Sequence, residues 1–357
     1  MTSTHSPKRR VAILGATGAV GQAFIRLLAD HPWFEIAALA ASERSAGKTY
    51  AEAARWVGDD AMPDRIAVMP VLACDPADVD ADLVFSALDA RAAGDVEPAF
   101  ARAGRMVLSN AKNYRMEPDV PLLMPEVNAH HLDVLATQRE RRGWTGAIVT
   151  NANCASIPAA MVLAPLHQAF GVRRLFMATM QAVSGAGYPG VPSLDILGNV
   201  IPFINDEEPK IEIEINKMLG HVSAGAIRPA PFAVTAHANR VSVEHGHTVC
   251  MSVEFEQSAG PDQVTAVLRD WRGAEEARGL PTAPERPIVL RDEPDRPQPR
   301  RDRMEGNGMA VVVGRVRRDP VFHVKLVAMT HNIIRGAAGA SVLNAELMAT
   351  RGLLDRP

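Results

Sequence analysis

A cysteine before an apolar helix-like segment is the first candidate for covalent chemistry. A strand-like run over residues 147–150 ends in a polar turn, and Cys154 follows that turn directly. A helix N-terminus favours a thiolate through its dipole and its unpaired N–H groups. Cys154 therefore suits a nucleophile. Cys74 and Cys250 stand in apolar or strand-like surroundings, where a buried and inert thiol is the ordinary expectation.

Three glycines near the start of the chain predict a dinucleotide-binding loop. Gly15, Gly18 and Gly21 stand between a strand-like run and an amphipathic segment. Glycine there lets the backbone turn tightly and approach a pyrophosphate, which then lies at the helix N-terminus. The spacing is GxxGxxG, so a turn that serves packing alone is the alternative. The residues expected to contact the cofactor in this loop are Gly15, Thr17, Gly18, Ala19, Val20 and Gly21.

The segment after the second strand-like run favours NADP. A site for NAD usually offers an acidic side chain to the ribose 2′-hydroxyl at this point. This chain instead has Ser42, Arg44 and Ser45, whose hydroxyl and guanidinium groups suit a 2′-phosphate. Glu43 leaves NAD open, and a solvated basic loop is the structural alternative.

The pattern of elements predicts an α/β protein with two domains. Apolar runs alternate with helix-like segments, which indicates βαβ units on a Rossmann-type parallel sheet. After about residue 156 the runs are richer in β-branched residues, which indicates an α+β domain with a mixed or antiparallel sheet. We expect a first domain over 1–153, completed by a long final helix over 334–357, and a second over 154–333. The strand-like runs are 11–16, 36–40, 83–88, 106–108, 122–124 and 147–150, then 175–183, 234–243, 248–255, 310–316 and 321–329.

Two further segments have distinct patterns. Residues 262–271 are helix-like, whereas residues 285–307 are dense in proline and arginine and predict a mobile surface loop.

Composition narrows the class of protein. The chain has 357 residues, 47% of them hydrophobic, and a formal net charge of −3. A net charge this close to zero gives no reason to expect nucleic acid or a membrane as a partner. The N-terminal apolar run is too short for a signal peptide, so we expect a cytoplasmic protein. The three cysteines form neither a disulfide framework nor a zinc-binding spacing, so no metal is expected.

Five motifs resemble the aspartate-semialdehyde dehydrogenases, especially their archaeal and fungal branch. They occur in the order typical of that family and span nearly the whole chain. The resemblance implies a Cys154 nucleophile, a Gln181 that orients the substrate, and a general acid/base histidine. The motifs lie at 153–156, 181–190, 214–220, 240–248 and 331–339.

Two histidines could serve as the acid/base. His245 and His247 lie two residues apart, on one face of an extended segment, so geometry alone leaves both open. The family has its histidine seven residues after an arginine, and Arg240 therefore selects His247.

The resemblance also implies the substrate and cofactor contacts. Arg240 would hold the α-carboxylate through two hydrogen bonds, and Glu214 would face the α-ammonium. Lys217, three residues further along a helix, would join Arg115 and Asn153 at the phosphate. A helical ion pair at the surface is the alternative for the Glu214–Lys217 pair. Further cofactor contacts are implied for Ser184, Gly185 and Asn332.

The reaction implied is the NADPH-dependent reduction of L-aspartyl 4-phosphate to L-aspartate 4-semialdehyde through a cysteine thioester. It belongs to lysine, methionine and threonine biosynthesis. The turn at Asn153 and Cys154 would donate hydrogen bonds to the oxyanion. A malonyl-CoA reductase or another acyl-phosphate reductase could keep the same cysteine and histidine, and a silent nucleotide-binding regulator would have lost them. The resemblance implies a homodimer or homotetramer whose contact is the second domain's sheet.

Overall fold

The strand before the glycine loop, β1, lies in the middle of the first sheet, between β2 and β4. The computed structural model describes residues 7–58 and 60–355, so positions 1–6 and 356–357 of the expected domain ranges lie outside it. Six parallel strands form the sheet in the order β3-β2-β1-β4-β5-β6, as expected for a Rossmann-type domain. The strands are β1 (Arg9–Leu14), β2 (Phe34–Ala41), β3 (Val71–Ala73), β4 (Leu83–Ser86), β5 (Met106–Ser109) and β6 (Ala147–Thr150).

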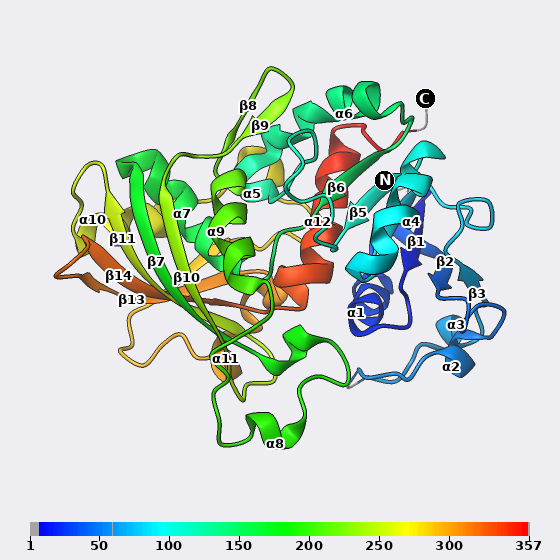
Figure 1. Ribbon diagram of the computed structural model, residues 1–357, viewed down its shortest axis with the longest axis horizontal. Coiled ribbons are helices and arrows are strands. Elements are labelled where there is room, and N and C mark those ends of the chain that lie inside the picture. Colours follow the sequence, from blue (N-terminus) through cyan, green and yellow to red (C-terminus); the bar gives the residue numbers. More distant parts are fainter. Residues whose placement is uncertain (1–6, 59, 356–357) are drawn as a thin grey trace, which may run out of the picture.

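Helices cover this sheet, and the chain returns to it at its end. Apolar residues of the last helix share one core with Phe24 and Phe85, whose rings stack at 4.9 Å. The helices of this part are α1 (Ala19–Leu28), α2 (Tyr50–Ala53), α3 (Asp64–Ala67), α4 (Ala90–Arg102), α5 (Pro125–Asn128), α6 (Leu135–Arg142) and α12 (Gly339–Thr350), with a 3₁₀ segment η1 (Ala129–Val134) (Figure 1).

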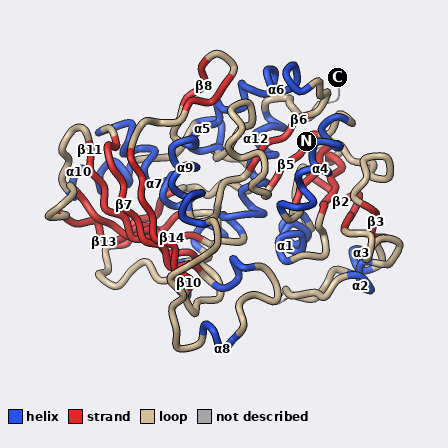
Figure 2. The backbone as a smooth tube through the Cα atoms, in the orientation of Figure 1, coloured by secondary structure: helices blue, strands red, loops and turns tan. Residues whose placement is uncertain are grey.

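The second sheet is mixed, which confirms the expected fold class. Its order is β10-β7-β11-β14-β13-β12, with parallel pairs at the two edges and antiparallel pairs between them. Figure 2 shows this sheet apart from the first one. Its strands are β7 (Val172–Gln181), β10 (Ala233–Arg240), β11 (His247–Phe255), β12 (Ile288–Arg291), β13 (Val311–Arg318) and β14 (Val324–Thr330), beside a hairpin of β8 (His221–Ser223) and β9 (Ala226–Arg228).

The helices of the second part include the two that bear on the site. α7 is mostly apolar and packs against β7, β11 and β14, whereas α9 packs against β10. No helix in the described ranges is long and apolar enough to cross a membrane. The elements are α7 (Ser156–Phe170), α8 (Ser193–Ile196), α9 (Glu207–Met218), α10 (Pro261–Asp270) and α11 (Pro299–Asp302), with short turns η2 (Val183–Ala186), η3 (Glu275–Ala277), η4 (Glu305–Gly308) and the π-helical η5 (Ile334–Ala338).

Three expectations about elements are wrong. The run 122–124 makes only an isolated bridge, between Leu122 and Thr150. The final helix begins as a π-helix and its α-helical part ends at Thr350. The segment 285–307 contains β12, α11 and η4 instead of an irregular loop. A buried carboxylate organises it, because Asp302 accepts hydrogen bonds from Arg291 Nε at 3.2 Å and Arg296 Nε at 2.7 Å.

Candidate active site

Three strand ends meet at one edge of the second sheet. Gln181 ends β7 and Arg240 ends the parallel neighbour β10, so the two residues are register partners. His247 begins the antiparallel neighbour β11 on the other side of β7. Because adjacent strands place their ends side by side, the sheet itself brings an amide, a guanidinium and an imidazole together. Arg240 Nη1 donates to Ala182 O at 2.9 Å, which orients its guanidinium.

The Cys154 turn stands between β6 and α7. Asn153 Oδ1 accepts from the N–H groups of Ala155 at 2.8 Å and Ser156 at 3.2 Å, so this side chain caps the helix. Burial raises the pKa of the Cys154 thiol to about 12 and the charge of Glu207 adds to this, whereas Arg115 and Arg240 oppose it. The resting cysteine is therefore a thiol.

A late segment of the chain, η5, lies directly against Cys154. A Cβ atom added to Gly336 would lie 2.6 Å from Cys154 Cβ. Asn151 Nδ2 donates to Ala337 O at 3.1 Å, which ties the π-helix to the same turn. Arg335 anchors this segment from behind, through two hydrogen bonds to Glu126 at 2.8 and 2.9 Å. Glycine at 336 is thus required by the space that the Cβ and Cα atoms of Cys154 occupy.

His247 is fully buried and has one defined hydrogen bond. Its Nδ1 accepts from the N–H of Ala182 at 3.1 Å, so a neutral ring carries its proton on Nε2. That Nε2 atom is buried and has no partner among the described residues. Burial, and after it the charge of Arg240, lowers the pKa of His247 to about 3. His247 therefore offers a hydrogen-bond donor at neutral pH.

Glu207 connects the cysteine turn to the strand ends. Its Oε1 accepts from Asn153 Nδ2 at 2.8 Å and from Gln181 Nε2 at 3.1 Å. Its Oε2 accepts from Lys210 Nζ at 2.9 Å. Burial by itself would raise the pKa of Glu207, but Lys210 and the two amide groups hold it below its usual value. A charged carboxylate thus lies at the first turn of α9.

Arg115, Glu214 and Lys217 form a separate buried group. Glu214 Oε1 accepts from Arg115 Nη1 at 2.9 Å, and its Oε2 accepts from the N–H of Asn153 at 2.6 Å. Lys217 Nζ donates to three backbone carbonyl groups. Burial lowers the pKa of Lys217 to about 7, although Asp119 and other nearby carboxylates oppose the shift.

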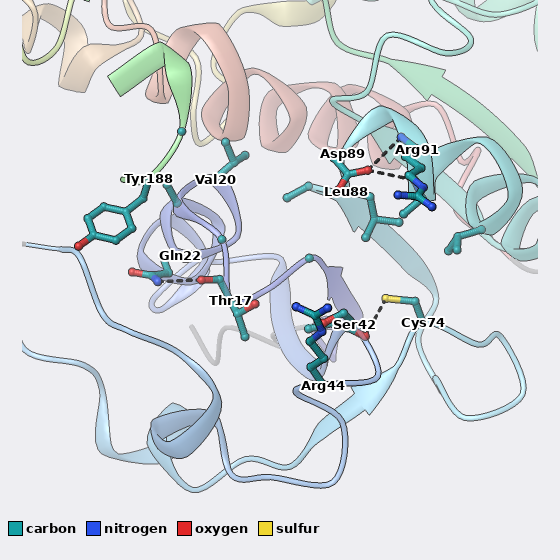
Figure 3. A pocket seen from close by; sticks show the side chains of 18 of the residues that line it. Thr17, Val20, Gln22, Ser42, Arg44, Cys74, Leu88, Asp89, Arg91 and Tyr188 are labelled. Carbon is teal, nitrogen blue, oxygen red and sulfur yellow. Dashed lines mark hydrogen bonds between the residues drawn. The ribbon is translucent and has the colours of Figure 1, made fainter. Parts of the chain in front are cut away.

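A large cavity lies at the carboxyl ends of the strands of the first sheet. Its volume is about 1260 Å³, and Figure 3 shows Ser42 and Arg44 on one side with Leu88 and Arg91 opposite. Tyr188 reaches it from the second part of the chain, with its ring centroid 5.0 Å from the guanidinium carbon of Arg55. Of the residues expected to bind the cofactor, the following line this cavity: Gly15, Thr17, Gly18, Ala19, Val20, Ser42 and Arg44.

The glycine loop fits a dinucleotide. Gly15 has a φ of +71°, and a Cβ there would lie 2.7 Å from Ala87 O. Gly18 has no atom closer than 3.5 Å to its added Cβ, so its bare backbone faces the cavity at the N-terminus of α1. Such N–H groups bind pyrophosphate. Gly21 serves packing instead, because its Cβ would lie 2.4 Å from Gly15 O.

The remaining expected cofactor residues lie elsewhere. Ser45 does not line the cavity. Asn332 Nδ2 donates to Ser184 Oγ at 2.9 Å and Asn332 Oδ1 accepts from Gly246 N at 2.8 Å. Gly185 packs against His247 and Arg240. Ser184, Gly185 and Asn332 thus lie beside the start of β11 and outside the lining of the large cavity.

Comparison with known proteins identifies the family. The domain described as "Semialdehyde dehydrogenase, NAD binding domain" matches residues 10–135, and "Semialdehyde dehydrogenase, dimerisation domain" matches residues 163–335. An aspartate-semialdehyde dehydrogenase of Methanothermobacter thermautotrophicus is 50% identical over 341 residues, 95% of this chain and 98% of that protein. One of Schizosaccharomyces pombe is 49% identical over 354 residues, 97% of this chain and 99% of that protein. The chain belongs to the aspartate-semialdehyde dehydrogenase family.

Solved structures of the family share the fold. The aspartate-semialdehyde dehydrogenase of Candida albicans with NADP has a TM-score of 0.89 at 42% identity, over 97% of this chain and 100% of that one. Aspartate-semialdehyde dehydrogenase II of Vibrio cholerae, complexed with ASA, has a TM-score of 0.75 at 28% identity, over 97% of this chain and 99% of that one. The resemblance deduced from the motifs is confirmed.

The contacts expected of Glu214 and Lys217 are wrong for this family member. Three carbonyl groups surround the Lys217 ammonium, which leaves it no donor for a phosphate. Glu214 is 1% exposed, and both of its oxygens are already bonded. The pair that faces the cysteine turn is Glu207 and Lys210, seven residues earlier.

The sequence of α9 offers both pairs as candidates. The spacing of three residues between a glutamate and a lysine occurs twice in α9, at Glu207–Lys210 and at Glu214–Lys217. Seven residues are about two helical turns, so both pairs lie on one face. Helical periodicity cannot show which of the two pairs faces the cysteine turn. The structure shows that it is the Glu207 pair, because Asn153 Nδ2 donates to Glu207. Arg91 and Tyr188 also line the large cavity and were not predicted from the sequence.

Proposed function

We propose that this chain is an aspartate-semialdehyde dehydrogenase that uses NADP. In the biosynthetic direction it reduces L-aspartyl 4-phosphate to L-aspartate 4-semialdehyde and releases inorganic phosphate, a step of lysine, methionine and threonine biosynthesis. The observation that carries this proposal is the meeting of Gln181, Arg240 and His247 at one sheet edge, joined to the Cys154 turn through Glu207. A nucleophile, a hydrogen-bond donor and an anion-binding guanidinium are the groups that the reaction requires.

The proposed mechanism follows from the protonation states. The sulfur of Cys154 attacks the C4 carbonyl; an S–C bond forms, the C–O bond to phosphate breaks, and the thiol proton leaves on the phosphate. Arg115 and Arg240 favour the thiolate that attacks. NADPH, when bound, supplies a hydride to the thioester carbonyl carbon. His247 Nε2–H donates to the oxygen of the thiohemiacetal, whose S–C bond then breaks to free the aldehyde. One proton from the medium restores the thiol.

Opposite charges around the cysteine support an amino-acid substrate. Arg240 would hold the α-carboxylate in a bidentate contact. Glu207, charged and close to Gln181, would hold the α-ammonium, which a CoA thioester substrate does not have. Lys210, Arg115 and Asn153 would hold the phosphate. Arg115 keeps a buried Nε donor with no partner among the described residues.

NADP is supported over NAD by the chemistry of the cavity wall. Ser42 and Arg44 line the cavity beyond β2, and Arg91 adds a second guanidinium from α4 across from them. Two cations and a hydroxyl suit a 2′-phosphate.

We also propose the two-domain division at residues 153 and 154, and a homodimer or homotetramer. The core of α12 is continuous with that of the first sheet, which supports a C-terminal segment that completes the first domain. The loop around α8 carries exposed apolar side chains and extends from the rest of the chain in Figure 1. Leu194 is 91% exposed and Phe203 67%, which supports burial against a second copy.

The test is phosphate-dependent reduction of NADP by L-aspartate semialdehyde, measured beside NADPH oxidation by malonyl-CoA. Turnover that needs both the semialdehyde and phosphate supports the proposal. Turnover with malonyl-CoA alone would overturn the substrate, and binding of NADP without any turnover would indicate a regulator. Cys154→Ala should abolish turnover and keep NADP binding, whereas Cys250→Ala, in β11, should keep both.

A further inference from the structure

The Lys217 ammonium group is enclosed by backbone oxygens of a single loop. Its Nζ donates to the carbonyl oxygens of Arg115 at 2.5 Å, Glu117 at 2.6 Å and Val120 at 2.8 Å. The side chain is 2% exposed. Lysine has three donors, and all three are used on this loop.

These partners distinguish Lys217 from a lysine held by an ion pair. No carboxylate oxygen lies within 4.0 Å of its Nζ in the part of the chain that is described. The cost of burying an ammonium is large unless its donors are satisfied. Three converging carbonyls satisfy them, and in return the ammonium fixes the backbone from residue 115 to residue 120.

One turn earlier on α9, Glu214 holds the side chain that this loop carries. Its Oε1 accepts from Arg115 Nη1 at 2.9 Å, while Arg115 Nη2 donates to Asn110 O at 2.7 Å. Arg115 is thus held at its carbonyl by Lys217 and at its guanidinium by Glu214. Two residues of one helix face therefore fix both ends of one arginine.

We propose that Lys217 is a positioning residue that aims Arg115 at the phosphate of the substrate. It acts through the 115–120 backbone and touches no substrate. This inference rests on the proposed function, in which Arg115 holds the phosphate. Loss of the ammonium frees the loop, so the guanidinium leaves the geometry that a bidentate phosphate contact requires.

The test compares Lys217→Met with Lys325→Met, which removes a lysine of β14; this strand pairs with β11 and β13, whereas α9 packs against β10. In Lys217→Met the KM for phosphate, measured during semialdehyde oxidation, should rise by about tenfold to a hundredfold. The KM for NADP should stay within about twofold of the wild type. A fall in kcat or thermal stability with an unchanged KM for phosphate would overturn the proposal. If Lys217→Met does not fold, Lys217→Arg is used with the same expected result, because a planar guanidinium cannot match three converging carbonyls.

A double-mutant cycle decides whether Lys217 acts through Arg115. In an Arg115→Met background, Lys217→Met should not raise the KM for phosphate further. Additive effects would show that Lys217 does not act through this arginine.

A separate readout distinguishes this inference from the proposed function. Phosphate protection of Cys154 against iodoacetamide is measured in the wild type and in Lys217→Met. If the wild type shows no phosphate-dependent turnover, the proposed function fails. If Lys217→Met needs a higher phosphate concentration than the wild type to protect Cys154, the positioning role of Lys217 is still supported. Equal phosphate concentrations for the two proteins overturn it.

Discussion

Ala182 donates its backbone N–H to Nδ1 of His247 at 3.1 Å. The neutral imidazole therefore carries its proton on Nε2, the nitrogen that has no partner among the described residues. A ring in this tautomer can donate to an oxyanion but cannot accept a proton at Nε2. His247, which the sequence predicts to act as an acid and base, is therefore in the tautomer that donates a hydrogen bond from Nε2.

The first prediction concerns that tautomer. The pKa of His247 is lowered to about 3 by burial, so the ring should stay neutral from pH 5 to pH 8. Nitrogen-15 NMR of labelled histidine, with His247→Gln to assign the signal, should show a protonated Nε2 and a bare Nδ1. A titration of this ring near the ordinary histidine value would contradict the tautomer argument.

Gly185→Ala should lower kcat without unfolding the protein. An added Cβ would lie 2.9 Å from Arg240 Nη1 and 3.1 Å from His247 Cε1, so both side chains must shift. We expect a loss in kcat/KM of about tenfold to a hundredfold. Gly260→Ala is the matched control, because its added Cβ has no neighbour closer than 3.9 Å. Equal activity of the two variants would show that the site has room at position 185.

Arg44→Ala should weaken NADP much more than NAD. The side chain lines the cavity beyond β2, and loss of a charge-assisted contact to the 2′-phosphate is expected to cost roughly 1.5–3 kcal/mol. Fluorescence titration with NADPH and NADH measures both affinities. An equal loss for the two cofactors would remove Arg44 from the 2′-phosphate site.

Stability should fall as the pH drops below about 6.5. Burial lowers the pKa of His131, His247 and His331 to about 3, so all three are neutral in the folded chain. The unfolded chain takes up protons near pH 6.5, and stability is lost from there down to about pH 3. Each histidine contributes a slope of up to about 1.4 kcal/mol per pH unit.

Urea unfolding between pH 7 and pH 4.5 measures this slope. His131→Gln should reduce it, since His131 lies outside the proposed active site and its Nε2 contacts Gly220 O at 3.2 Å. His221→Gln, at an exposed position of β8, is the control and should leave the slope unchanged. The same slope in both variants would exclude His131 as a source of acid sensitivity.

Local patterns predicted most of the framework because local forces determine it. The turn from Gly15 to Gly21 and the step from strand to helix at Cys154 depend on neighbours in sequence, and both are found where expected. The resemblance supplied Gln181, Arg240 and His247, and the register of three strands brings them together. The two-sheet fold follows from the same patterns.

The rest depends on contacts distant in sequence. Glu207 was missed because only the position of Asn153, 54 residues earlier, distinguishes it from Glu214. The segment 285–307 has the composition of a loop, yet Asp302 gathers two arginines and orders it. Such partners are set by tertiary packing, which neither propensity nor periodicity reports.

The contact between Gly336 and Cys154 means that the surroundings of the cysteine are completed only late in synthesis of the chain. Cys154 lies before the middle of the sequence, but Gly336, whose backbone packs against it, follows 182 residues later. A nascent chain that stops short of Gly336 has the Cys154 turn but lacks the backbone that closes one side of it.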